Sequence, residues 1–102
     1  MKYQLVLQWP ASSADDYDAL VQMENDLNEG LPEDCVVDGH DGGAGEMNIF
    51  ILTNDPHKTF TEAQAILEAA PLWPEMRAAF RDLERLELTV LWPPNLRQLD
   101  VS

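Results

Sequence analysis

The first half of the chain lacks basic side chains. Residues 3–57 contain twelve Asp and Glu and no Lys or Arg, whereas the rest of the 102-residue chain carries six basic and seven acidic side chains. The formal net charge is −13. Lys and Arg make the phosphate contacts by which proteins bind nucleic acids and anionic membranes. We therefore expect no nucleic-acid and no membrane partner, and we expect a basic protein or a cation to be attracted to this half.

Cysteine and long apolar runs are scarce as well. Cys35 is the single thiol, which excludes an intrachain disulfide and is typical of a reducing compartment. The N-terminal segment is interrupted by glutamines and lacks the features of a secretory signal. No apolar run approaches the about 18 residues that a membrane helix requires. These absences predict a cytoplasmic protein.

The chain also lacks an established metal-binding or phosphate-binding loop. Segment 38–46 is acidic and rich in glycine, and its carboxylates and imidazole could bind a divalent cation. The weak candidates for cation ligands are Asp38, His40, Asp41 and Glu46. Their spacing does not fit an EF-hand, and the Gly-Lys-Ser/Thr ending of a phosphate loop is missing. We interpret the segment as an acidic turn and predict no metal and no cofactor, with a cation site as the weaker alternative.

Catalysis has little support in the sequence. Cys35 together with His40 could supply a thiolate nucleophile and its base. However, Cys35 is predicted on an apolar strand and His40 at a loop tip, and side chains in such positions rarely converge. We therefore predict no catalytic residues and favour a non-enzymatic protein over an enzyme.

Apolar periodicity predicts the first two elements. Alternation over residues 3–9 indicates a strand with one buried face, which Pro10 ends. Residues 13–31 have helical spacing, with Ser12 or Ser13 as the predicted cap, and Gly30 and Pro32 mark the end of this helix. Its predicted apolar stripe consists of Tyr17, Leu20, Val21, Met23, Leu27 and Leu31.

A β-hairpin is expected next. Two apolar segments, 35–37 and 47–53, flank the acidic link 38–46 and predict two strands joined by a long tip. Asp55 and Pro56 then fit the cap and the first position of a second helix.

Prolines divide the second helical region. Pro71 and Pro74 predict a break in this helix, followed by a helical continuation. Its predicted inward-facing residues are Met76, Ala79, Phe80 and Leu83. A final strand is expected over 86–92, with a buried face formed by Leu86, Leu88, Val90 and Trp92. We expect residues 1–94 to form a single domain and residues 95–102 to be a loosely attached tail.

The predicted order of elements is β-α-β-β-α-β. Its simplest compact solution is an α+β ferredoxin-like two-layer sandwich, in which two helices cover one face of a four-stranded antiparallel sheet. The other sheet face is then open. The apolar residues predicted on this open face are Val6, Phe50, Leu52 and Leu91. A second copy or a ligand commonly covers such a face, so a homodimer is one expectation.

The charge pattern indicates a binding surface for a basic partner. The acidic face of helix 13–31 has no lysine one turn away, so its carboxylates repel one another. The predicted partner-binding surface consists of Asp15, Asp18, Glu24, Asp26, Asp38, Asp41 and Glu46. The leading hypothesis is an acidic protein-interaction module, for example an inhibitor or immunity-type protein for a basic enzyme. The alternative is a small-molecule-binding or catalytic homodimer that uses the open sheet face, with the 38–46 loop as a flap.

Overall fold

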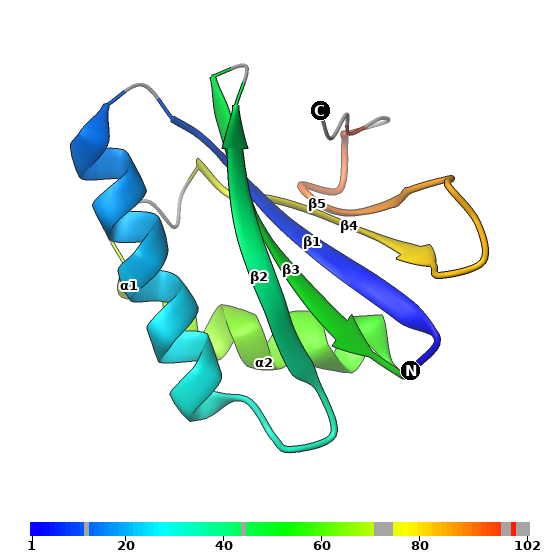
Figure 1. The fold of residues 1–102 in the computed structure, drawn as a ribbon. Coiled ribbons are helices and arrows are strands. Elements are labelled where there is room, and N and C mark those ends of the chain that lie inside the picture. The colour runs from blue at the N-terminus through cyan, green and yellow to red at the C-terminus, as the bar shows by residue number, and fades with distance from the viewer. Residues whose placement is uncertain (12, 44, 71–74, 97–98, 100–102) are drawn as a thin grey trace.

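The centre of the protein is an antiparallel sheet, shown in Figure 1. The structure is a computed structural model and describes residues 1–11, 13–43, 45–70, 75–96 and 99. Within these residues the elements are β1 (Tyr3–Pro10), α1 (Ala14–Gly30), β2 (Val36–Gly43), β3 (Glu46–Thr53), α2 (Pro56–Leu67), β4 (Arg77–Asp82) and β5 (Thr89–Trp92). The five strands lie in the order β2-β3-β1-β4-β5. β1 is therefore the middle strand and pairs with both β3 and β4.

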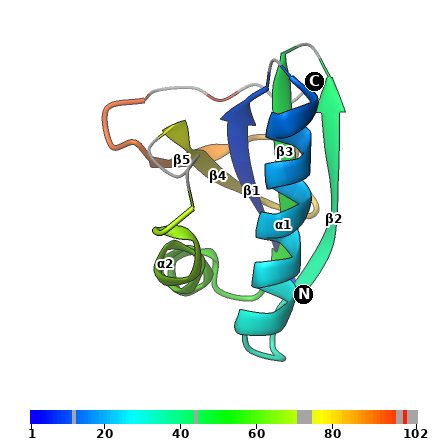
Figure 2. The ribbon, with the colours of Figure 1, turned by 90° about the vertical axis from the view of Figure 1, so that its left-hand side faces the viewer.

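Both helices pack on one face of this sheet. Figure 1 shows α2 crossing behind the strands, and Figure 2 views the molecule from the side of α1. The predicted α+β class, with an antiparallel sheet and two helices, is confirmed. The predicted number of four strands is wrong, because β5 adds a fifth, and the ferredoxin-like order is therefore met only roughly.

The side chains of β1 point alternately to the two faces of the sheet, and the buried apolar residues form one cluster on each face. Leu5, Leu7 and Trp9 are fully buried on the side of the helices. There they join apolar residues of the other elements in the larger cluster, which we call the helix-side core. Its other fully or nearly fully buried members are Leu20, Met23, Leu27, Met47, Ile49, Ile51, Ala63, Leu67, Met76 and Ala78. The period of two along a strand thus places every second residue of β1 in this core.

A smaller cluster covers part of the opposite face. Val6, Ala79 and Leu99 are 1%, 0% and 5% exposed. The half-buried residues packed against them are Phe50, Leu88, Val90 and Leu96. Leu91, predicted on this open face, packs against the helix-side core instead.

The C-terminal segment contributes to that cover. Leu96 and Leu99 belong to the segment 95–102, which the sequence predicts to be loosely attached, and both pack in the smaller cluster. Residues 97–98 and 100–102 lie outside the described residues.

The region after the second helix differs from the prediction. Residues 77–82 form strand β4 rather than a helical continuation. Ala and Arg favour helices, but here the segment supplies the second neighbour of β1, with Leu7 opposite Ala78 and Val6 opposite Ala79. Both alanines are fully buried. Adjacent residues of a strand point to opposite faces of the sheet, so β4 is covered on both faces here. The predicted break at residues 71–74 lies outside the described residues.

The final strand is shorter than predicted. β5 begins at Thr89, and Leu86 in the preceding connection is 91% exposed. Leu88 and Val90 pack on the face away from the helices. The register shifts between Ala78 and Ala79 of β4, and such an irregularity changes which side chains face the core. The predicted buried face of this strand is therefore wrong.

The first helix begins at its predicted cap but presents part of its apolar stripe to solvent. Ser13 Oγ accepts a hydrogen bond of 3.2 Å from the backbone N–H of Asp16. The buried residues of α1 are Leu20, Met23 and Leu27. Tyr17 and Val21 are 41% and 36% exposed. Both belong to the flank of α1 that lies toward β2, where the sheet ends and covers the helix less.

Candidate functional site

β2 is the edge strand beside α1. The sheet order places it at one end, so β3 is its strand partner within the described part of the chain. Residues 38–43, predicted as part of a long loop, belong to this strand. Gly and Asp are disfavoured in strands, but pairing with the apolar β3 holds them here. A segment that is hydrogen-bonded in the sheet is not free to move as the flap that the alternative hypothesis requires.

A β-bulge interrupts the pairing near the start of β2. The register shifts between Val37 and Gly39, so Asp38 is the extra residue. Gly39 has a φ of 114°, a conformation that residues with a Cβ rarely adopt. A Cβ at this position would meet no atom within 4 Å. The glycine is therefore required for the backbone conformation of the bulge and not for space.

His40 joins β2 to α1. Its Nδ1 lies 2.8 Å from Glu24 Oε2, and the two side chains are 27% and 16% exposed. The imidazole meets the Tyr17 ring edge-on at a centroid distance of 5.5 Å. A Cβ on Gly42, the next residue on this side of the strand, would lie 3.1 Å from the Tyr17 ring. These contacts hold α1 close to β2 and place Glu24 at their junction.

Asp41 lies on the opposite face of the sheet. Its Oδ1 accepts a hydrogen bond of 2.9 Å from Asn48 Nδ2, and Asn48 Oδ1 accepts one of 3.0 Å from Gln8 Nε2. Gln8 and Asn48 are 1% and 2% exposed. A polar chain thus runs across β2, β3 and β1, and it fixes the Asp41 carboxylate at the edge of the sheet.

The four predicted cation ligands do not converge. His40 faces α1, whereas Asp41 and Glu46 lie on the other face of the sheet, and Asp38 occupies the bulge. Across the described residues, no group of three or more His, Cys, Asp or Glu side chains is placed to hold a metal ion. The geometry gives the cation hypothesis no support.

The acidic residues of α1 divide between its two flanks. Glu24 contacts His40 of β2. Asp26 lies one turn before Gly30, where an added Cβ would come within 2.9 Å of Ile66 in α2, so Asp26 belongs to the α2 flank. Asp15 precedes Asp26 by about three turns and shares that flank. The predicted acidic residues of α1 therefore lie on more than one flank of the helix.

Two of the ion pairs between described residues involve acids of residues 3–57. These pairs are His40 with Glu24 and Lys58 with Asp34. Lys58 Nζ lies 3.7 Å from Asp34 Oδ2, with the two side chains 57% and 68% exposed. A pair this exposed contributes about 0–1 kcal/mol. The Lys58 pair therefore offsets little of the negative charge of residues 3–57.

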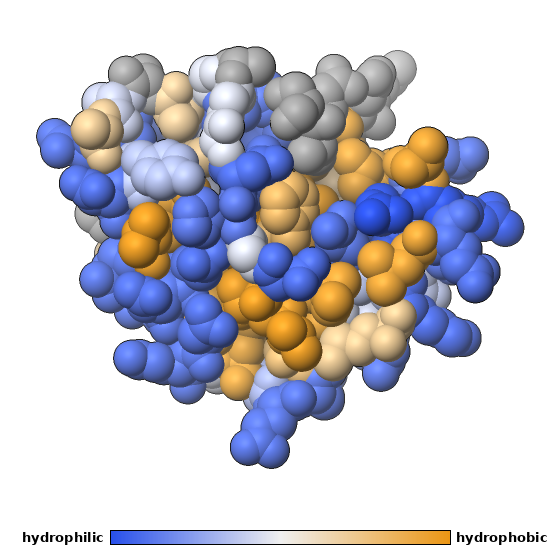
Figure 3. Space-filling model, in the orientation of Figure 1, coloured by the Kyte–Doolittle hydropathy of each residue, from blue (hydrophilic) through white to orange (hydrophobic). Residues whose placement is uncertain are grey.

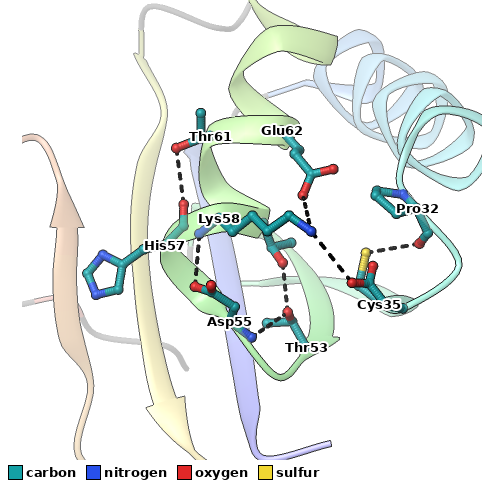
Figure 4. Close-up of polar contacts among 10 residues, drawn as sticks. Pro32, Cys35, Thr53, Asp55, His57, Lys58, Thr61 and Glu62 are labelled. Carbon is teal, nitrogen blue, oxygen red and sulfur yellow. Dashed lines mark hydrogen bonds and ion pairs between the residues drawn. The ribbon is translucent and has the colours of Figure 1, made fainter.

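Cys35 lies at the start of the hairpin, as Figure 4 shows. Its Sγ donates a hydrogen bond of 3.3 Å to the carbonyl oxygen of Pro32. Burial raises the pKa of the thiol, and the carboxylates of Asp34 and Glu62 raise it further, against a smaller opposite effect of Lys58. The thiol is therefore protonated at neutral pH and is poorly suited to act as a nucleophile.

The open sheet face retains an apolar region beside the β2 edge. Val36 is 46% exposed, and Phe50 and Leu52 are half-buried. Figure 3 shows hydrophobic residues gathered near the middle of this face and surrounded by hydrophilic ones. Val36 pairs with Leu52, so the apolar region begins at the edge strand itself.

The contact between His40 and Glu24 has no sequence signal. The two residues are 16 positions apart and lie on different elements, so neither helical nor strand periodicity relates them. The exposure of Tyr17 and Val21 was also missed, because both fit the predicted apolar stripe of the helix. Only the position of β2 at the end of the sheet explains these features.

In the part of the chain that the structure describes, no helix is both long enough and apolar enough to span a membrane. Comparison of the chain with protein-family models, with curated proteins and with solved structures found no match. The surface of the protein is therefore the remaining guide to its function.

Proposed function

We propose that this protein is a non-enzymatic interaction module that binds a basic protein partner. The binding surface is formed by the outward and β2-facing sides of α1 and by β2 itself. An inhibitor or immunity-type protein that neutralises a basic enzyme is one concrete form of this function.

One observation carries the proposal. The half of the chain without Lys or Arg includes two neighbouring elements, α1 and β2, and Asp18 and Asp38 are exposed on them. Charges of one sign on adjacent elements attract an oppositely charged partner and give a fast, salt-sensitive association rate. Charge alone also improves solubility, so the position of the charge must be tested separately from its amount.

Two charge-matched variants make that test. Asp18→Lys with Asp38→Lys changes the proposed surface, whereas Glu84→Lys with Glu87→Lys changes the exposed connection between β4 and β5. Each pair raises the net charge by four, from −13 to −9. In a pull-down, we expect the first pair to lose the partners that the unchanged protein captures at low salt, and the second pair to keep them. Captured partners no more basic than the background, or equal loss by both pairs, would contradict the proposal.

A homodimer or small-molecule site on the open sheet face is the second candidate. The exposed Val36 and the half-buried Phe50 and Leu52 favour it. Sedimentation at rising protein concentration and native mass spectrometry test it. A strict monomer without a co-purified ligand would count against this candidate.

The architecture itself assigns no function. We interpret β2-β3-β1-β4 with the two helices as a ferredoxin-like unit extended by β5. Folds of this kind carry many unrelated functions, so the proposal depends on the surface of α1 and β2 and not on the fold.

A further inference from the structure

The free edge of β2 is a surface onto which another strand can pair. β2 has eight residues and pairs with β3 along one side within the described residues. In an antiparallel strand, alternate residues direct their backbone N–H and C=O groups away from the neighbouring strand. An edge strand accepts an extended segment where it is not protected, and the bulge at Asp38 leaves residues 39–43 as the longest regular part of this edge. Figure 2 shows β2 at the margin of the sheet with α1 beside it.

The charge of this edge opposes pairing with a second copy. Asp38 is exposed in the bulge and Asp41 is half-buried at the margin. Two such edges placed side by side would bring like charges together, in molecules that each carry a net charge of −13, and like charges opposite each other destabilise a sheet. A segment with Lys or Arg near these positions is instead attracted. Charge therefore selects a basic occupant over a second copy of this chain.

The neighbouring flank of α1 offers apolar contacts to the same occupant. Tyr17 and Glu24 of α1 both contact His40 of β2. Val21 lies four residues after Tyr17 and three before Glu24, so it shares their flank. Tyr17 and Val21 are 41% and 36% exposed. A strand added to β2 would direct alternate side chains toward these two residues.

We infer that β2 binds an extended, basic segment of a partner protein by strand addition. The backbone of the segment pairs with the free edge of β2, and its Lys or Arg side chains lie near Asp38 and Asp41. Its alternate apolar side chains pack against Tyr17 and Val21 of α1. This inference rests on the proposed function and specifies the form of the partner.

The probe is an eight-residue peptide of alternating Lys and Val, matched to the eight residues of β2. Its controls have the same charge: one is N-methylated at every residue, and one has its four Lys and four Val in separate blocks. Binding is followed by NMR through amide chemical shifts and amide hydrogen exchange. We expect the alternating peptide to shift and protect amides of β2, and both controls to bind at least about tenfold more weakly, because pairing needs free N–H groups and alternating side chains.

A protein variant tests the apolar contact. Val21→Ser should weaken binding of the alternating peptide about fivefold, since it removes apolar area from the contact. Leu86→Ser is the matched control, because Leu86 is 91% exposed and distant in the sheet order from β2. It should leave the affinity unchanged.

The outcomes separate the inference from the proposed function. Equal binding of the alternating and N-methylated peptides, or shifts confined to α1, would overturn strand addition and leave electrostatic docking in place. If no peptide binds at millimolar concentration and low salt, strand addition is also overturned. The proposed function is tested separately, by the pull-down with the charge-matched variants. A homodimer of the unchanged protein whose interface protects the amides of β2 from exchange would assign the edge to a second copy and contradict the inference.

Discussion

Cys35 shows how the surroundings of a single side chain decide its chemistry. Its pKa is raised by burial first and then by the carboxylates of Asp34 and Glu62. A raised folded-state pKa means that the neutral thiol is favoured in the folded protein. Its contribution to stability is fully present below the pKa of the unfolded chain and is lost as the pH rises through the folded-state pKa.

The alkylation rate of Cys35 tests this account. At pH 8 we expect iodoacetamide to react more slowly with the folded chain than with the chain unfolded in urea, because the thiolate is the reactive form. Glu62→Gln should accelerate the reaction, since it removes a charge that raises the pKa, and Lys58→Met should slow it. Equal rates for the folded and unfolded chains would show an accessible thiol that ionises like a free cysteine.

Among the elements, β4 shows how tertiary pairing overrides local preference. Residues 77–82 contain good helix formers, yet all six of them pair with β1, opposite Tyr3 to Gln8. Ala78 packs in the helix-side core, and Ala79 packs in the smaller cluster on the opposite face. Small side chains at both positions allow the sheet to be covered closely on its two faces.

Enlarging these alanines tests that arrangement. We expect Ala78→Leu and Ala79→Leu each to lower the free energy of unfolding by about 1–3 kcal/mol, because each overfills a packed cluster. Ala14→Leu, at an exposed position of α1, should change it by less than about 0.5 kcal/mol. Urea unfolding measures all three variants. A large decrease in the free energy of unfolding for only one of these two variants would indicate that one face of β4 is open.

Much of the element pattern is predictable because the periodic signals are strong. The strand over residues 3–9 alternates, and Ser13 and Asp55 cap the two helices as expected. The segments that the sequence misreads have weak or misleading signals. Glycine and aspartate at residues 38–43 suggest a loop, and only their position against the apolar β3 makes them a strand.

The candidate site is less predictable than the fold. Net charge and its uneven distribution are visible in the sequence, so an acidic surface can be expected. Which acids share a surface depends on the packing of α1, which turns Glu24 toward β2 and Asp26 toward α2. The free edge of β2 follows from the order of strands, which local periodicity does not determine.

For the whole molecule, the net charge of −13 implies self-repulsion in the folded state. We expect the melting temperature to rise by several degrees when NaCl is increased from about 0.02 M to about 0.5 M, because salt screens charges on the surface. Asp18→Lys with Glu29→Lys should reduce this dependence, since both positions are exposed on α1. Differential scanning calorimetry measures the effect. A melting temperature that does not change with salt would show that the acids are too far apart to repel one another.

The middle position of β1 has a consequence for synthesis of the chain. Gln4 pairs with Leu52 on one side and with Arg81 on the other, so both neighbours of this strand are translated long after it. A growing chain that has not yet reached β4 carries an unfinished sheet with apolar surface exposed on the ribosome. Proteins that depend on such distant pairings fold more slowly than those with local contacts. A nascent chain that lacks its partner strands therefore exposes apolar surface and an unpaired strand edge, both of which favour aggregation.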